Sequence, residues 1–276
     1  MAHNGLLQSL LVLESYRTVL LQVPARMPAS LIRLIVADCG LSSCSLWQLP
    51  YALSHWSGRN RGLQAITEGN LTALSLMALI VPPCAPDAEA SDSGDAASAS
   101  LTDYVHATFH GLGAGRDFSI SELLMYHMMN ISLHVSLDLL QCFTRSTSGE
   151  CMEASKDLVT NRVKKWHSSK HGIVACWHAT RIMTGTQEEL HKQVKTQERT
   201  VTRPESMDAT ETPLLSAPHV SYSIYYASIV LWSAATISGS AKVERDQHLK
   251  TGSKLLRSLP VRVASTLANA LSEIPG

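Results

Sequence analysis

The stretch Ala217-Pro-His-Val-Ser-Tyr-Ser-Ile-Tyr-Tyr-Ala-Ser-Ile-Val-Leu-Trp232 decides the fold of this chain. From Val220 to Ala241 the sequence contains no Asp, Glu, Lys or Arg. Pro218 suits a first helical turn, where its missing N–H costs nothing, and Gly239 stands where a helix would stop. We therefore predict one helix over about residues 218–237.

This helix lacks a polar face. Tyr222, Tyr225, Tyr226, Ile229 and Trp232 fall at helical spacings, and small or apolar residues fill the opposite side. We predict that other helices cover it, as the buried centre of a helical domain. The alternative is a single membrane span, since about 1.5 Å per residue brings the uncharged run close to the thickness of a bilayer. Interspersed serines and tyrosines spread along the segment favour the buried helix.

The composition is that of an ordinary globular protein. The chain has 276 residues, is 45% hydrophobic, and balances 23 Lys and Arg against 23 Asp and Glu. It can bury a core, and its zero formal charge disfavours a chain that grips nucleic acid as a whole. Six cysteines without a Cys-x-x-Cys pair, and a start without a basic leader, predict a reducing cytosolic or nuclear location.

Apolar stripes and proline breaks divide the chain. Residues 1–83 are predicted to be helical, with breaks at Pro24 and Pro28 and an end at Pro82. Residues 84–118 are predicted to form a disordered, acidic, Ala/Ser/Gly-rich insertion, because acids without any base occupy 84–103. An activation-type tail is the alternative, but it would carry interleaved aromatics.

A helical core is predicted over 119–276, in one domain with residues 45–83. Ser119 and Glu122 have the spacing of a capping box and open an apolar helix. Further apolar stripes continue to terminal helices that bend at Pro260. No stretch alternates with the period of a strand, so the predicted fold class is all-α.

Residues 156–203 carry a local excess of positive charge, with ten bases against four acids. A nucleic-acid stripe is conceivable, but the segment lacks aromatics apart from Trp166 and Trp177, which are spaced as core residues. We therefore interpret the bases as a solvated helical face.

Three histidines suggest a metal site. His167, His171 and His178 would fall within about 40° of one helix face at 100° per residue, and Cys176 or Cys151 could add a ligand. A metal-dependent enzyme that uses these histidines is thus an alternative. Gly172 would interrupt that helix, however, and no His-Glu-x-x-His arrangement occurs.

Other catalytic signals are weak. The glycine-rich loop at 110–115 follows no predicted strand, and the chain has no Gly-x-Ser-x-Gly elbow. We expect no enzyme, no catalytic residues and no cofactor.

Four segments, in this order, resemble the regulatory (middle homology) domain of fungal-specific transcription factors: residues 49–56, 133–140, 166–179 and 217–232. The last two are the most distinctive, because a Trp…Trp-His-Ala helix precedes an Ala-Pro-His…Tyr-Tyr-Ala…Leu-Trp helix. The resemblance covers about residues 45–271 and implies an all-α domain of a nuclear transcription regulator without catalytic residues. It implies structural roles for Trp166, Trp177, His178, Pro218, His219, Tyr226 and Trp232.

The sequence departs from that family in one respect. It has neither a six-cysteine zinc cluster nor a finger with paired cysteines and histidines. We expect zinc only in an absent DNA-binding domain, with DNA reached indirectly or through such a domain. The expected partners are other transcription proteins, a homodimer is an option, and the expected targets are metabolic or biosynthetic genes. A carboxyl-terminal fragment, a mispredicted or decayed gene and a stand-alone accessory regulator remain open as origins.

Overall fold

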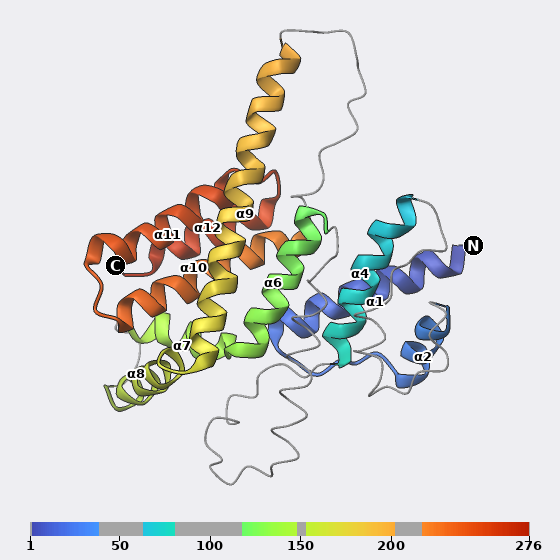
Figure 1. Cartoon of the computed structure of the whole chain (residues 1–276). Helices are drawn as coiled ribbons and strands as arrows, with labels where there is room; N and C mark the ends of the chain where they lie inside the picture. Colours follow the sequence, from blue (N-terminus) through green and yellow to red (C-terminus); the bar gives the residue numbers. More distant parts are fainter. Residues whose placement is uncertain (1, 39–62, 81–117, 148–152, 202–216, 276) are drawn as a thin grey trace. The chain divides into compact units, whose positions relative to one another are not determined.

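A computed structural model describes residues 2–38, 63–80, 118–147, 153–201 and 217–275. These described residues form ten helices and no strand, which confirms the all-α prediction (Figure 1). They divide into two compact units, Met1–Phe118 and Ser119–Gly276. The predicted acidic insertion, apart from Phe118, and the family-like segment at 49–56 lie outside the described residues.

The first unit contains α1 (Ala2–Leu21), α2 (Ala29–Asp38) and α4 (Leu63–Ile80). Helices α1 and α4 pack together, and the Ser15 hydroxyl donates a hydrogen bond to the Ser75 hydroxyl at 3.2 Å. Within α1, the Arg17 guanidinium pairs with the Glu14 carboxylate at 2.8 Å and lowers the pKa of that carboxyl to about 2. The proline breaks at 24 and 28 fall outside these helices, as predicted.

The second unit is built around α10 (Pro218–Ile237). Its other helices are α6 (Ile120–His134), α7 (Leu137–Thr147), α8 (Glu153–His167), α9 (Lys170–Val201), α11 (Lys242–Arg257) and α12 (Arg262–Glu273), and all of them contact α10. The predicted helix over 218–237 is confirmed. Gly239 follows it at a φ of +71°, and the Ser240 N–H donates to the Ala235 carbonyl at 3.0 Å, which closes the last turn.

Helix α10 is buried although it contains several hydroxyl groups. Trp232 is 1% exposed, and its ring lies 5.6 Å from that of Phe143 on α7. The Ser223 and Ser228 hydroxyls each donate to the carbonyl four residues earlier at 2.7 Å, so these polar groups are satisfied within the helix.

By length and composition α10 could also cross a membrane, with a mean hydropathy of 1.2. However, 67% of the most apolar 18-residue stretch of this helix is buried inside the protein. The surrounding helices therefore supply the apolar environment that a bilayer would otherwise provide, as predicted for a core helix.

Helix α6 begins at the predicted capping box. The Ser119 hydroxyl accepts a hydrogen bond from the Glu122 N–H at 3.3 Å, and the Glu122 carboxylate accepts one from the Ser119 N–H at 2.8 Å. From Leu124 onward every residue of α6 is buried, so the helix forms an inner layer of this unit.

The sequence predicts an interruption at Gly172, and the structure has the break slightly earlier. Helix α8 ends at His167 and α9 begins at Lys170. The interruption precedes Gly172, which lies in the first turn of α9. A Cβ at Gly172 would stand 2.5 Å from the Trp166 carbonyl, so this tight connection requires glycine.

The break separates the two tryptophans. Trp166 is buried, whereas Trp177 is 55% exposed and Ile173 is 69% exposed. The expectation that Trp177 is spaced as a core residue is therefore wrong. A new helix begins after the turn that follows α8, so the spacing from Trp166 no longer determines which face of α9 carries Trp177.

Candidate functional site: paired histidines and a basic groove

The structure does not bring His167, His171 and His178 together. His167 lies at the end of α8, with Nε2 3.2 Å from the Ser238 hydroxyl, while His171 and His178 each meet a different histidine of α6. Among the described residues, no group of three or more His, Cys, Asp or Glu side chains has a geometry suited to a metal ion. The predicted one-face arrangement fails because those three residues do not share a helix.

Two histidine pairs instead join α6 to α9. The Nδ1 atoms of His127 and His178 lie 2.8 Å apart, and those of His134 and His171 lie 2.9 Å apart. On each helix the two histidines are seven residues apart, and the order of pairing shows that α6 and α9 run antiparallel (Figure 1). Spacing of seven residues returns a helix to the same face, so both pairs lie along one helix contact.

Each pair holds together only while one ring is uncharged. A nitrogen can accept the partner's N–H only if it carries no proton itself, so at least one imidazole of each pair is neutral. Burial, with a smaller contribution from the positive charge of Arg181, lowers the pKa of His127 to about 4. At neutral pH His127 is therefore uncharged and poorly suited to general-base chemistry, which favours a pKa near the working pH.

Trp177 lies over the His127–His178 pair. Its ring meets His127 at 5.8 Å and His178 at 4.7 Å, both edge to face. The Arg181 guanidinium lies 6.0 Å from the centre of the Trp177 ring. This arrangement gives the exposed tryptophan a role in covering a polar contact rather than in filling the core.

His219 makes a third buried imidazole contact. Its Nε2 lies 2.9 Å from the Ser121 carbonyl and so donates to it, which ties the first turn of α10 to the start of α6. Burial lowers the pKa of His219 to about 4, although the Ser121 hydrogen bond acts in the opposite direction.

Most residues implied by the family resemblance are buried. The Trp166 indole N–H donates to the His134 carbonyl at 2.9 Å, and the Tyr226 hydroxyl accepts from Gln141 at 2.8 Å. Burial raises the pKa of Tyr226 to about 12. His178, His219 and Trp232 are buried as well, whereas Pro218 and Trp177 are exposed.

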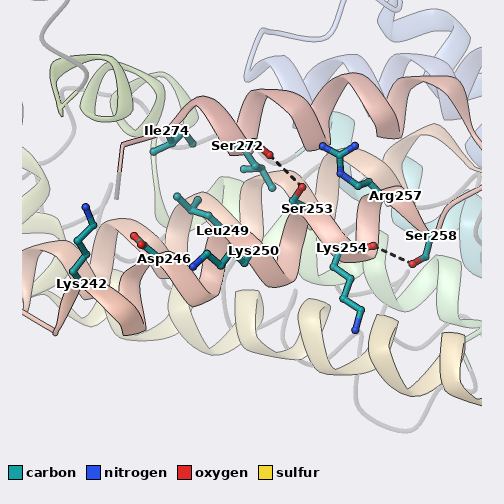
Figure 2. Close-up of a pocket in the computed structure, with 11 residues that line it drawn as sticks. Lys242, Asp246, Leu249, Lys250, Ser253, Lys254, Arg257, Ser258, Ser272 and Ile274 are labelled. Atoms are coloured by element: carbon teal, nitrogen blue, oxygen red, sulfur yellow. Dashed lines mark hydrogen bonds between the residues drawn. The ribbon is translucent and has the colours of Figure 1, made fainter.

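A groove of about 690 Å³ lies between α11 and the end of α12 (Figure 2). Its walls carry one acidic side chain, Asp246, and four basic ones: Lys242, Lys250, Lys254 and Arg257. Leu249, Leu271 and Ile274 add an apolar surface, and Ser253, Ser258 and Ser272 add hydroxyls. The groove therefore combines positive charge with an apolar lining, the two features that an amphipathic anion requires.

The basic segment predicted as a solvated face is largely exposed where it is described. Lys164, Lys165, Lys170, Arg181, Lys192 and Lys195 are all exposed. This agrees with the solvated-face interpretation. Cys151 and the glycine-rich loop at 110–115 lie outside the described residues.

Sequence reasoning missed His127 and His134 as partners of the α9 histidines. The signal was present, because each helix carries histidines seven residues apart. It also missed the α11 row, where charged residues recur in steps of four from Lys242 to Lys254.

Comparisons with models of protein families, with curated proteins and with solved structures find no match to this chain.

Proposed function

We propose that the chain is the regulatory and interaction part of a fungal-specific transcription regulator. It acts in the nucleus through other transcription proteins, and reaches DNA through them or through a DNA-binding domain that is not in this sequence. The proposal includes no catalytic step and no resident cofactor.

The observation that carries the proposal is the meeting of three family-like segments in one core. Residues 133–140, 166–179 and 217–232 belong to successive helices of the second unit. Trp166 joins the second of these segments to His134 of the first, and His171 also pairs with His134. The distinctive residues of the resemblance thus lie in one packed helical unit, and this supports the proposal.

The histidine pairs support a structural use of the polar residues in that core. The rings of His127 and His178 meet each other and the ring of Trp177, with Arg181 nearby. The rings of His134 and His171 meet each other with centres 5.2 Å apart. A buried polar contact of this kind favours one register between two helices over its alternatives. A domain that transmits regulation through helix contacts needs such a defined register.

Tethering to DNA tests the proposal directly. The chain is fused to an unrelated DNA-binding domain in a fungal cell, and the output of a reporter with matching sites is measured. We expect output that differs severalfold from that of the DNA-binding domain alone, or fused to an unrelated helical protein of equal size. Output equal to both controls in cells with nuclear fusion protein would contradict the proposal.

DNA binding by the purified chain gives a second test. Affinity for a duplex comes largely from neutralised phosphates, and this chain has zero formal charge. We expect only non-specific association, with a dissociation constant of about 10⁻⁴–10⁻⁶ M. A discrete gel-shift complex at nanomolar protein, resistant to competitor DNA, would show that the chain reads DNA itself.

A further inference from the structure

A row of charged side chains runs along α11. Lys242, Asp246, Lys250 and Lys254 follow one another in steps of four residues, and Arg257 follows three residues later. Residues at these spacings lie along one side of a helix. That side borders the groove, which the end of α12 closes on its opposite wall (Figure 2).

Basic side chains outnumber acidic ones in the lining of the groove. In the part of the chain that the structure describes, the acid–base ion pairs involve neither Lys250 nor Lys254. One carboxylate, from Asp246, shares the lining with four cations. The Arg257 guanidinium donates to the Asn269 side-chain oxygen at 2.9 Å, and this hydrogen bond holds the positive group at the end of the groove. Unpaired cations gathered on one wall create a potential that attracts an anion.

The hydroxyls of the lining are already used as donors. The Ser253 and Ser272 hydroxyls donate to the Ala268 carbonyl at 3.2 and 3.0 Å, and the Ser258 hydroxyl donates to the Lys254 carbonyl at 3.0 Å. A ligand's negative oxygens would therefore be met by the ammonium and guanidinium groups. Beneath them, Leu249 and Leu271 are buried and Ile274 is half-buried, so an apolar tail finds an apolar floor.

We propose that this groove binds a small amphipathic anion, a carboxylate or phosphate joined to a short apolar tail. The volume of about 690 Å³ lies within the range of about 300–1,000 Å³ that small-molecule sites occupy. The head group lies against Lys250, Lys254 and Arg257, and the tail lies on Leu249, Leu271 and Ile274. The site does not depend on the proposed transcriptional function, because binding is a property of the purified chain.

Titration of the full chain with sodium octanoate and with octyl phosphate, followed by calorimetry and by amide NMR, tests the proposal. We expect saturable binding that shifts the amides of α11 and α12. Octanol lacks the charge, acetate lacks the tail and octylamine carries the opposite charge, so each should bind at least tenfold more weakly. Raising the salt concentration should weaken octanoate binding, because exposed charges are screened. The two octyl anions separate a carboxylate site from a phosphate site, and binding of either one supports the proposal.

Matched variants locate the site. Lys250→Glu with Lys254→Glu should weaken octanoate binding at least tenfold, whereas Lys164→Glu with Lys165→Glu on α8 makes the same change in charge at exposed positions and should leave it unchanged. Ile274→Ser should weaken binding, whereas Val243→Ser, at an exposed apolar position outside the groove, should not. Absence of octanoate and octyl phosphate binding, equal effects of the two lysine pairs, or acetate binding as tight as that of octanoate would overturn the proposal.

Discussion

At the scale of single residues, the buried imidazoles of His127 and His219 give stability that depends on pH. Burial lowers the pKa of each ring to about 4, against an ordinary value of 6.5. Between these values the unfolded chain binds more protons than the folded one, so stability present above about pH 6.5 is lost as the pH falls towards 4. Each ring accounts for about 3 kcal/mol across this interval, at about 1.36 kcal/mol per pKa unit.

Denaturant unfolding between pH 7 and pH 4 measures this dependence. His127→Gln keeps a hydrogen-bonding side chain beside His178 but does not titrate, so its free energy of unfolding should fall less steeply with acid. His191→Gln, at an exposed position on α9, should have the slope of the unchanged protein. Identical slopes for His127→Gln and the unchanged protein would show that His127 is not held uncharged by burial.

The sequence predicts residues whose role depends on their own helix better than residues whose role depends on a partner. Ser119 and Glu122 are found correctly, because both ends of their hydrogen bonds lie within four residues. His127 and His134 are missed, since their role appears only when α9 is placed beside α6. Trp177 is misjudged because its exposure depends on a turn eight residues earlier.

At the scale of helices, the contact between α10 and α11 depends on Gly252. A Cβ at this position would lie 1.9 Å from the Ser228 hydroxyl oxygen and 2.8 Å from its Cβ. Gly252→Ala therefore forces the two helices apart, and overpacking of this kind costs about 1–3 kcal/mol. Thermal and denaturant unfolding of the purified variant measure the loss.

Gly185→Ala is the matched control on α9. Its added Cβ would meet only the Ile120 side chain, at an ordinary 3.5 Å. Replacement of a helical glycine without strain should stabilise the protein by about 0.4–1 kcal/mol. If the two alanine variants had the same stability, the close approach of α10 and α11 would be refuted.

The capping box of α6 gives a prediction at the same scale. Ser119→Ala removes the hydroxyl that accepts the Glu122 N–H and should cost about 0.5–2 kcal/mol. Ser155→Ala, at an exposed position on α8, should change the free energy of unfolding by about 0.5 kcal/mol at most. Equal stabilities of these two variants would argue against a cap at Ser119.

Helix positions are predictable here where the sequence contains its own stop signals. Pro218 and Gly239 mark both ends of α10, and prolines separate α1 from α2 and α11 from α12. The break between α8 and α9 carries no proline. Gly172 marks an interruption in the sequence, but glycine and serine also occur inside helices, so the sequence does not fix the break at the two residues between His167 and Lys170.

At the scale of the whole molecule, the division before Ser119 predicts a second unit that folds alone. Residues 119–276 contain α10 together with α6, α7, α8, α9, α11 and α12, which all pack against it. Expressed without residues 1–118, this unit should be helical by circular dichroism and should unfold cooperatively. A molten or insoluble product would instead favour the sequence-based prediction that residues 45–83 belong to the same domain.

The second unit is organised around a buried α10, and two tryptophan variants test this arrangement. Trp232→Ala removes a side chain that is 1% exposed and should lower the free energy of unfolding by about 3–5 kcal/mol. Trp177→Ala removes the same side chain from a position that is 55% exposed and should cost less than about 1 kcal/mol.

Trp232→Phe keeps most of the buried volume, so its free energy of unfolding should lie between those of the unchanged protein and Trp232→Ala. It keeps the test usable if Trp232→Ala fails to fold. Denaturant unfolding of the four proteins in parallel, including the unchanged chain, is the deciding measurement. The free energy of unfolding should decrease in the order unchanged, Trp177→Ala, Trp232→Phe, Trp232→Ala. A soluble Trp232→Ala protein as stable as Trp177→Ala would show that α10 is not the core of this fold.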